Sequence, residues 1–280
     1  MSGWDRVLRA ALAAEFAAIC GCFSAAAQER PRPPFPCGGE TVAHGVTAGR
    51  VIDGRTFVLA DGREVRLAAI EVPALSPSQE TEGSPGVAAR DALAAELGGA
   101  EIVLKQGEPQ KTDRYGRIVA YAFTARDGAE RSAQAGLIAA GFARVAARVG
   151  SRACAAELLS REDAARRAKL GLWASSYYDS LNADDPAAVL AAIGRFALVE
   201  GKVVSVRESG ATIYANFGRR WSEDFTVTIL KRNERSFTAA GLEPKKLAGR
   251  RVRVRGWIEE RGGPWIEAAR PEQIEIVDRE

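Results

Sequence analysis

The stretch KTDRYGRIVAY, residues 111–121, joins a turn, a cluster of positive charge and a strand. Asp113 can accept a hydrogen bond from the backbone two residues further on, and Gly116 tolerates a positive φ. The stretch therefore predicts a tight turn that delivers Arg117 into a strand at 118–121. A guanidinium held by a stiff turn suits a phosphate group, which it can bind through two oxygens. The alternative interpretation is a surface hairpin whose arginines are only solvated.

The sequence on both sides of this stretch predicts a meander of strands with three helices. Upstream, apolar residues alternate from Val51 through 56–59 to 65–69, with a turn signal at Asp61 and Gly62. A further strand is expected at 102–104. Helices are expected at the following ranges, each of which a glycine follows within two residues: 87–97, 132–140 and 154–169.

The C-terminal part of the sequence predicts a second β-rich domain at 195–280. Residues 176–194, with a short alanine-rich helix, predict the linker that precedes it. A helical connection is expected at 237–247, between the third and fourth of five strands: 197–206, 212–217, 225–230, 251–259 and 265–277. That layout is typical of a small OB-type barrel. We expect a β-rich α+β protein with two OB-like barrels, although no sequence repeat relates them.

Composition and charge allow a nucleic-acid partner without requiring one. The chain has 280 residues, enough for two domains, a net charge of +3 and an isoelectric point near 8.7. DNA, RNA or another polyanion is compatible with this mild basic balance. His44 is the only histidine, which argues against catalysis or metal binding by imidazole.

The first 27 residues have the layout of a secretory signal. Two arginines precede an apolar stretch at 10–23, and a run of three alanines ends at Ala27. We expect cleavage after Ala27 and a secreted or periplasmic protein. Residues 19–22 loosely resemble a lipoprotein acylation box, and we favour cleavage over a lipid anchor at Cys22. The apolar stretch is too short and too rich in small residues to span a membrane.

Two cysteines are left once the signal is removed. Residues 28–44 contain four prolines and predict an extended tether, which Cys37 would fasten to the fold. Cys37 and Cys154 belong to a chain bound for an oxidising compartment, where such a pair is most simply a disulfide. Closing so long a loop would contribute about 4–5 kcal/mol by constraining the unfolded state.

Residues 45–175 contain four distinctive segments: VIDGRT at 51–56, VRLAAIEVP at 65–73, TDRYGR at 112–117 and GLW at 171–173. Through these segments the region resembles the thermonuclease (staphylococcal nuclease-like) family. The resemblance implies an OB barrel with three helices and calcium-dependent cleavage of DNA and RNA. In that chemistry carboxylates hold the ion, a glutamate activates water and two arginines bind the phosphate. Arg66 and Arg117 match the two arginines, and Arg114 and Tyr115 match positions that contact nucleotide.

The sequence departs from the family at a metal-binding position and at the position of the catalytic base. Arg55 stands where a calcium-binding aspartate is expected, and Ala74 stands at the catalytic glutamate position. Glu71 matches a second metal-binding carboxylate. Because hard cations need several oxygen ligands and are repelled by a neighbouring guanidinium, we expect no cofactor, with Ca²⁺ relevant only if cleavage is retained. Glu80 and Glu82, in the loop that follows, are the alternative candidates for a base.

We hypothesise that Arg55 pairs with Glu71 or Asp53 and fills the metal site with a built-in cation. Phosphate would then be held between Arg55, Arg66 and Arg117, so that the domain binds nucleic acid without cutting it. Two alternatives remain: an active endonuclease with altered metal use, and an envelope module whose barrels contact protein.

The predicted C-terminal barrel mixes aromatic and basic residues, a composition that suits stacking and phosphate contacts with a single strand. Some of these aromatic residues must face the barrel core, and OB barrels also bind sugars and proteins. The residues are Tyr214, Phe217, Trp221, Phe225, Trp257 and Trp265 among Arg207, Arg219, Arg220, Lys231, Arg232, Arg253 and Arg255.

Overall fold

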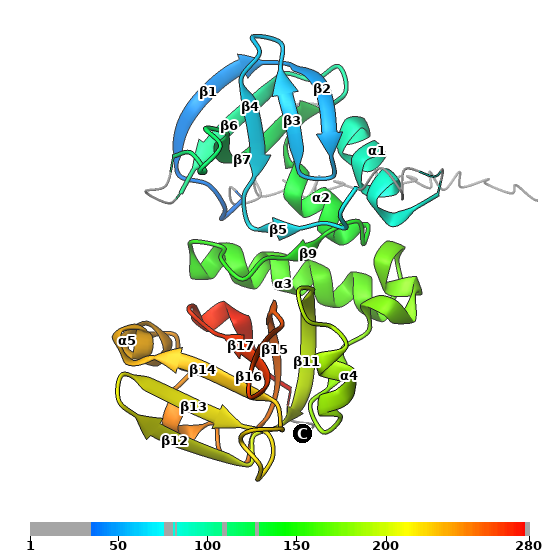
Figure 1. Cartoon of the computed structure of the whole chain (residues 1–280). Coiled ribbons are helices and arrows are strands. Elements are labelled where there is room, and N and C mark those ends of the chain that lie inside the picture. The colour runs from blue at the N-terminus through cyan, green and yellow to red at the C-terminus, as the bar shows by residue number, and fades with distance from the viewer. Residues whose placement is uncertain (1–34, 76–80, 82, 108–110, 127–128, 278–280) are drawn as a thin grey trace, which may run out of the picture. The chain divides into compact units, whose positions relative to one another are not determined.

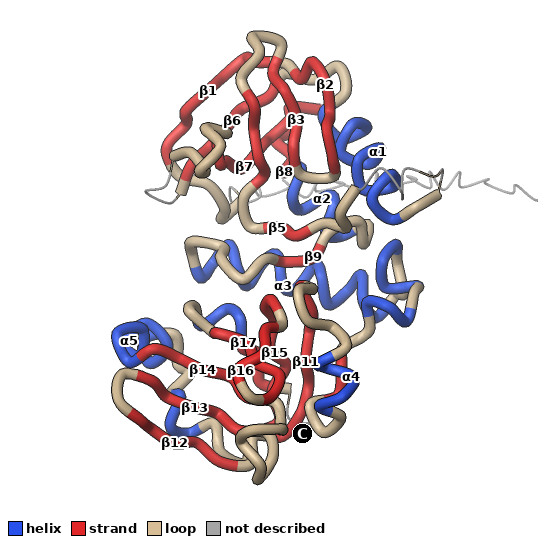
Figure 2. Tube along the Cα trace, in the orientation of Figure 1, coloured by secondary structure: helices blue, strands red, loops and turns tan. Residues whose placement is uncertain are grey.

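A computed structural model of the chain describes residues 35–75, 81, 83–107, 111–126 and 129–277 (Figure 1). Phe35–Glu280 form one compact unit. The described residues form a β-rich α+β structure with five α-helices and several sheets (Figure 2). None of the described helices is long and apolar enough to cross a membrane. The expected signal peptide and the alternative anchor at Cys22 lie outside the described residues.

The N-terminal strands follow the pairing of an OB-type barrel. Their sheet runs in the order β1-β6-β7-β4-β3-β2, in which β4 and β7 are parallel and the other neighbours antiparallel. Only Thr47 separates β1 from β2, so the order begins and ends on two halves of one segment. The strands are β1 (Glu40–Val46), β2 (Ala48–Asp53), β3 (Thr56–Leu59), β4 (Glu64–Leu67), β5 (Ile70–Glu71), β6 (Ile102–Gln106), β7 (Ile118–Arg126), β8 (Ala129–Ser132) and β9 (Arg144–Val145).

The C-terminal strands repeat this pairing scheme. The meander β12-β13-β14 is antiparallel, β14 pairs in parallel with β17, β16 pairs with β17, and β11 pairs with β15. Strand pairing alone closes neither barrel among the described residues. The strands are β10 (Leu181–Asn182), β11 (Phe196–Lys202), β12 (Ser205–Ser209), β13 (Thr212–Asn216), β14 (Thr226–Leu230), β15 (Arg251–Trp257), β16 (Glu259–Arg261), β17 (Gly263–Glu267) and β18 (Ile274–Ile276). We call β1–β4, β6 and β7 the N-terminal barrel and β11–β17 the C-terminal barrel.

A serine caps each of the first three helices. The side chains of Ser84, Ser132 and Ser151 accept a hydrogen bond from a backbone N–H in the first turn, at 3.4, 3.3 and 3.1 Å. These caps place the helix starts within two residues of the predicted ones. The helices are α1 (Pro85–Leu97), α2 (Ala133–Ala139), α3 (Arg152–Arg167), α4 (Pro186–Leu190) and α5 (Lys231–Ala239).

Three predicted segments differ from the structure. Glu40–Val46 form β1, although residues 40–44 were expected in the tether, because backbone pairing with β6 holds them despite their weak apolar pattern. The expected linker 176–194 packs Ala183, Val189 and Ala192 into the C-terminal core. The helix expected at 237–247 is α5, which begins at Lys231 and ends at Ala239. Its first turns are charged and show no apolar spacing, so the sequence pattern did not indicate this start.

Each barrel has its own hydrophobic core. Phe57, Leu104 and Phe123 are buried in the first, and Val199 and Phe237 in the second. A smaller cluster of Ala165, Trp173 and Leu198 connects α3 and the GLW segment with β11. This cluster joins the two cores through apolar contact.

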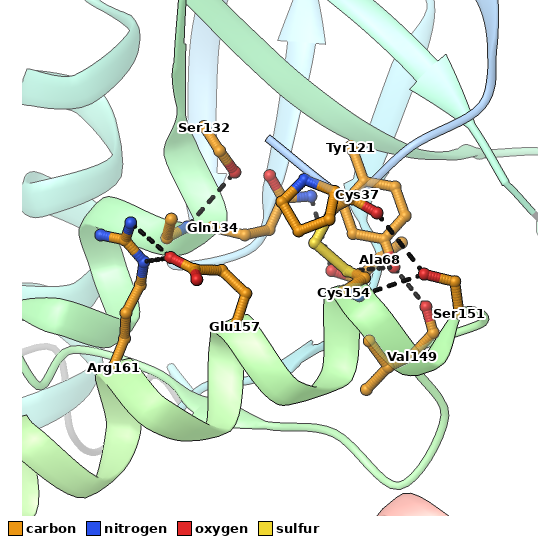
Figure 3. The surroundings of a disulfide bond; sticks show 12 residues. Cys37, Ala68, Tyr121, Ser132, Gln134, Val149, Ser151, Cys154, Glu157 and Arg161 are labelled. Atoms are coloured by element: carbon orange, nitrogen blue, oxygen red, sulfur yellow. Dashed lines mark hydrogen bonds and ion pairs between the residues drawn. A yellow bond between two sulfur atoms is a disulfide. The ribbon is translucent and has the colours of Figure 1, made fainter. Parts of the chain in front are cut away.

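A disulfide between Cys37 and Cys154 fastens the segment before β1 to α3 (Figure 3). The two Cα atoms lie 4.6 Å apart, although the cysteines are 117 positions apart in the sequence. The Tyr121 hydroxyl donates to the Val149 carbonyl nearby, and Ser151 Oγ donates to the Pro36 carbonyl at 3.4 Å. The predicted cysteine pairing is therefore confirmed, and it is consistent with an extracellular location.

A buried arginine links the C-terminal barrel to α3. Arg255 on β15 is 1% exposed and pairs with Glu162 at 2.7 Å and with Glu275 at 2.6 Å. Its Nη1 also donates to the Val145 carbonyl at 3.1 Å. Burial lowers the pKa of Arg255, but the charges of Glu162 and Glu275 outweigh burial and raise the pKa above its ordinary value.

Candidate nucleic-acid interface

The turn at 111–117 is built as the sequence predicts. Asp113 Oδ1 accepts hydrogen bonds from the backbone N–H groups of Tyr115 at 2.9 Å and Arg117 at 3.1 Å. Gly116 adopts a φ of 80°, and Thr112 forms a bridge with Ile118 where β7 begins. The turn therefore fixes the position from which the Arg117 side chain leaves the strand.

Arg117 is held by two further contacts. Its Nε and Nη2 bond Asp113 Oδ2 at 2.8 and 2.7 Å. Burial raises the pKa of Asp113, but hydrogen bonds from Arg117 and Tyr115 outweigh it and leave the pKa below its ordinary value. The guanidinium carbons of Arg114 and Arg117 lie 4.8 and 5.1 Å from the Tyr115 ring centroid, and Tyr115 is 67% exposed. The turn thus presents an aromatic ring flanked by two cations to solvent.

Arg66, on β4, is a half-buried cation among other charges. No described residue forms a hydrogen bond or ion pair with its side chain. Burial lowers the pKa of Arg66, the charges of Arg55 and Arg117 lower it further, and Glu71 and Asp113 oppose them. The three arginines expected to bind phosphate are therefore close enough for their charges to interact.

A cavity of about 290 Å³ opens beside Arg66. Gln106 and Arg148, which the sequence analysis did not single out, also line it. Gln106 Nε2 donates to the carbonyls of Lys111 and Val119 at 2.7 and 2.9 Å, which ties the 111–117 turn to β6. The lining residues include Arg66, Glu71, Gln106, Asp113, Tyr121, Ala146, Ala147, Arg148 and Val149.

Arg55 forms an ion pair with Glu71, one of the two carboxylates anticipated for it. Asp53, the other, accepts the backbone N–H of Arg55 at 2.8 Å. Arg55, Glu71 and Ala74 line a second cavity of about 530 Å³. The methyl group of Ala74 can neither accept nor donate a proton, so nothing at that position acts as a base.

These residues fit a calcium ion poorly. The Glu71 carboxylate is already paired with the Arg55 guanidinium. Calcium needs about 6–8 oxygen ligands and is repelled by a neighbouring positive charge. Among the described residues, no group of three or more histidine, cysteine, aspartate or glutamate side chains is placed to hold a metal ion. Glu80 and Glu82, the alternative bases, lie outside the described residues.

Several residues of the second cavity come from outside the segments that carry the resemblance. Arg144 on β9 is buried, donates through Nη1 to the Phe196 carbonyl at 2.6 Å and lies 5.3 Å from the Tyr178 ring centroid. The guanidinium carbon of Arg195 lies 3.6 Å from the Tyr177 ring centroid. Burial lowers the pKa of Arg144. No local pattern marks these residues, because tertiary packing alone brings them together.

Comparison with protein families gives one match to this region. Residues 64–175 match the family described as staphylococcal nuclease homologue. The matched segment contains β4, the 111–117 turn, all of α1–α3 and the GLW segment. A comparison with curated proteins found no match.

Proposed function

We propose that the staphylococcal nuclease-like domain at residues 45–175, of which residues 64–175 match the family, binds DNA or RNA, or another phosphate-rich polyanion, without cleaving it. Arg66 is the observation that carries this proposal. It is half-buried, no described residue pairs with it, and the charges of Arg55 and Arg117 act on it. Because Arg55 and Arg117 are already paired with Glu71 and Asp113, a phosphate beside Arg66 neutralises the remaining positive charge of the cluster.

The exposed turn supplies the second part of the interface. Tyr115 offers an aromatic face on which a base can stack, and Arg114 and Arg117 flank its ring. Stacking of this kind favours single strands, whose bases are free, over duplexes. Arg148 adds an exposed cation at the edge of the Arg66 cavity.

The loss of cleavage rests on two positions. Ala74 provides no base, and Arg55 places a fixed cation on the carboxylate of Glu71. We therefore propose that binding needs no calcium and persists with a chelator present. Together with the predicted signal, the disulfide supports action outside the cytoplasm, in the periplasm or secreted medium.

Fluorescence anisotropy of short labelled single-stranded DNA and RNA over a series of salt concentrations tests the proposal. The wild-type protein should bind with an affinity that falls steeply with salt, because phosphate contacts release counterions. Arg66→Ala should weaken binding about tenfold or more and reduce the magnitude of the salt slope by about 0.7–0.9. Binding should be unchanged by chelator.

Arg63→Ala is the matched control. Arg63 lies in the turn between β3 and β4, where it is exposed and pairs with Asp61 at 2.7 Å, and it does not line the Arg66 cavity. Its loss should leave the affinity and salt slope unchanged. Equal effects of Arg63→Ala and Arg66→Ala would indicate only non-specific charge. Absent or salt-independent binding would contradict the proposal and favour a protein-interaction role.

A further inference from the structure

A groove of about 270 Å³ lies on the C-terminal barrel, over one face of the strands β13, β14 and β17. Successive side chains along these strands point alternately to the two faces of the sheet. Ile213, Val227 and Ile266 point into the core, and their neighbours line the groove. Seven of the lining residues carry hydroxyl, amide or carboxylate groups: Thr212, Tyr214, Asn216, Asp224, Thr226, Thr228 and Glu267. Arg261, Trp221 and Trp265 also line the groove.

Two tryptophans frame the groove. Trp265 is buried, its indole N–H donates to Thr228 Oγ1 at 2.7 Å, and the Arg261 guanidinium lies 3.7 Å from its ring centroid. Trp221, in the loop between β13 and β14, is 75% exposed. Asp224 anchors that loop by accepting the backbone N–H of Arg220 at 2.6 Å. A large exposed indole on an anchored loop beside a polar groove favours a ligand that stacks.

The charges of the groove do not suit a phosphate chain. Arg261 is the only cation among the lining residues, against two carboxylates, Asp224 and Glu267. Single-strand binding sites instead line their groove with positive charge. The side chains of Tyr214 and Glu267 have no hydrogen-bond partner among the described residues. They can accept from, and in the case of Tyr214 donate to, ligand hydroxyl groups.

We propose that this groove binds a neutral oligosaccharide. The apolar face of one sugar ring stacks on Trp221, and its hydroxyl groups bond Glu267, Tyr214 and the threonines of β13 and β14. A ligand rich in hydroxyl groups and without charge matches both the excess of carboxylates and the aromatic platform. The site is separate from the Arg66 cluster and does not depend on the proposed nucleic-acid binding.

Saturation-transfer NMR and tryptophan fluorescence titration of the full chain with cellotetraose, chitotetraose and maltotetraose test this proposal. At least one of the three should bind, and Trp221→Ala should weaken it about tenfold. Glu267→Gln should weaken it less, because an amide oxygen still accepts. Because Trp221 is exposed, thermal unfolding of Trp221→Ala should match the wild type, which separates lost contact from lost fold.

Trp257→Ala is the matched control, since Trp257 is a half-exposed tryptophan of the same barrel outside the groove. It should leave sugar affinity unchanged. No binding of any of the three sugars, or equal effects of the two tryptophan variants, would overturn the proposal. So would loss of oligothymidylate binding in Trp221→Ala, which would assign the groove to nucleic acid. Arg66→Ala, which tests the N-terminal site, should not alter sugar binding.

Discussion

The two barrels share one strand-pairing scheme but differ in the charge around their cavities. In the N-terminal barrel the cavity carboxylates, Glu71 and Asp113, are each paired with an arginine outside the lining. Among the described residues no side chain pairs with Arg66, and Arg148 adds an exposed cation to the same cavity. In the groove of the C-terminal barrel, the two lining carboxylates, Asp224 and Glu267, outnumber the one lining arginine, and the exposed Trp221 borders the groove. A shared pairing scheme therefore does not imply a shared ligand, because the side chains that line each cavity differ in charge.

The largest expected effect comes from breaking the contact between the C-terminal barrel and α3. Arg255→Ala leaves Glu162 buried without its cation and should lower the free energy of unfolding by about 3–5 kcal/mol. Urea unfolding followed by circular dichroism measures it. Arg251→Ala, on the same strand but half-exposed, should cost less than about 1 kcal/mol.

A double variant separates charge from packing at this contact. Arg255→Met combined with Glu162→Gln removes the charges of this buried pair, keeps an acceptor for the Val145 N–H, and leaves Glu275 beside Arg253. It should recover part of the stability lost in Arg255→Ala. Failure to recover would mean that shape, and not the unpaired carboxylate, accounts for the loss.

The second prediction rebuilds what the N-terminal site lacks. Arg55→Asp removes the cation that engages Glu71 and places a third carboxylate beside Asp53. Calcium at about 100 times its Kd should then stabilise the variant by about 2–3 kcal/mol, whereas the wild type gains nothing. Thermal unfolding with and without calcium measures this. Adding Ala74→Glu should bring calcium-dependent cleavage, and a calcium-insensitive Arg55→Asp would show that the ion pair is not what excludes the metal.

The smallest expected effect lies on the surface of the C-terminal barrel. Hydrogen bonds from Lys231 and Lys245 lower the pKa of Glu208 to about 2. Because the folded pKa lies below the ordinary value of 4.5, the stabilisation is present above that value and is lost as the pH falls towards about 2. Carboxyl chemical shifts in an NMR titration measure the pKa. Lys231→Ala should raise it, and an unchanged pKa would contradict the contact.

Local sequence was enough for the parts whose structure is local. The 111–117 turn follows from Asp113 and Gly116, and the capping serines define the first three helices. The start of α5 was not predicted because its first turns are charged. Strand β1 was not predicted because it depends on backbone pairing with β6 and has only a weak apolar pattern. For the candidate site, four matching segments located Arg66 and Arg117, whereas Gln106, Arg144 and Arg148 were missed because only folding brings them to the cavities.

The central claim is that the N-terminal site binds phosphate without cutting. The most direct test incubates labelled single-stranded and double-stranded DNA with the purified mature protein and, in parallel, with its Arg66→Ala variant. Each incubation is run with calcium, with other divalent ions and with chelator. The account predicts intact DNA in every condition, together with salt-sensitive binding that Arg66→Ala weakens. Cleavage by the wild-type protein that Arg66→Ala abolishes would contradict it and identify an active nuclease.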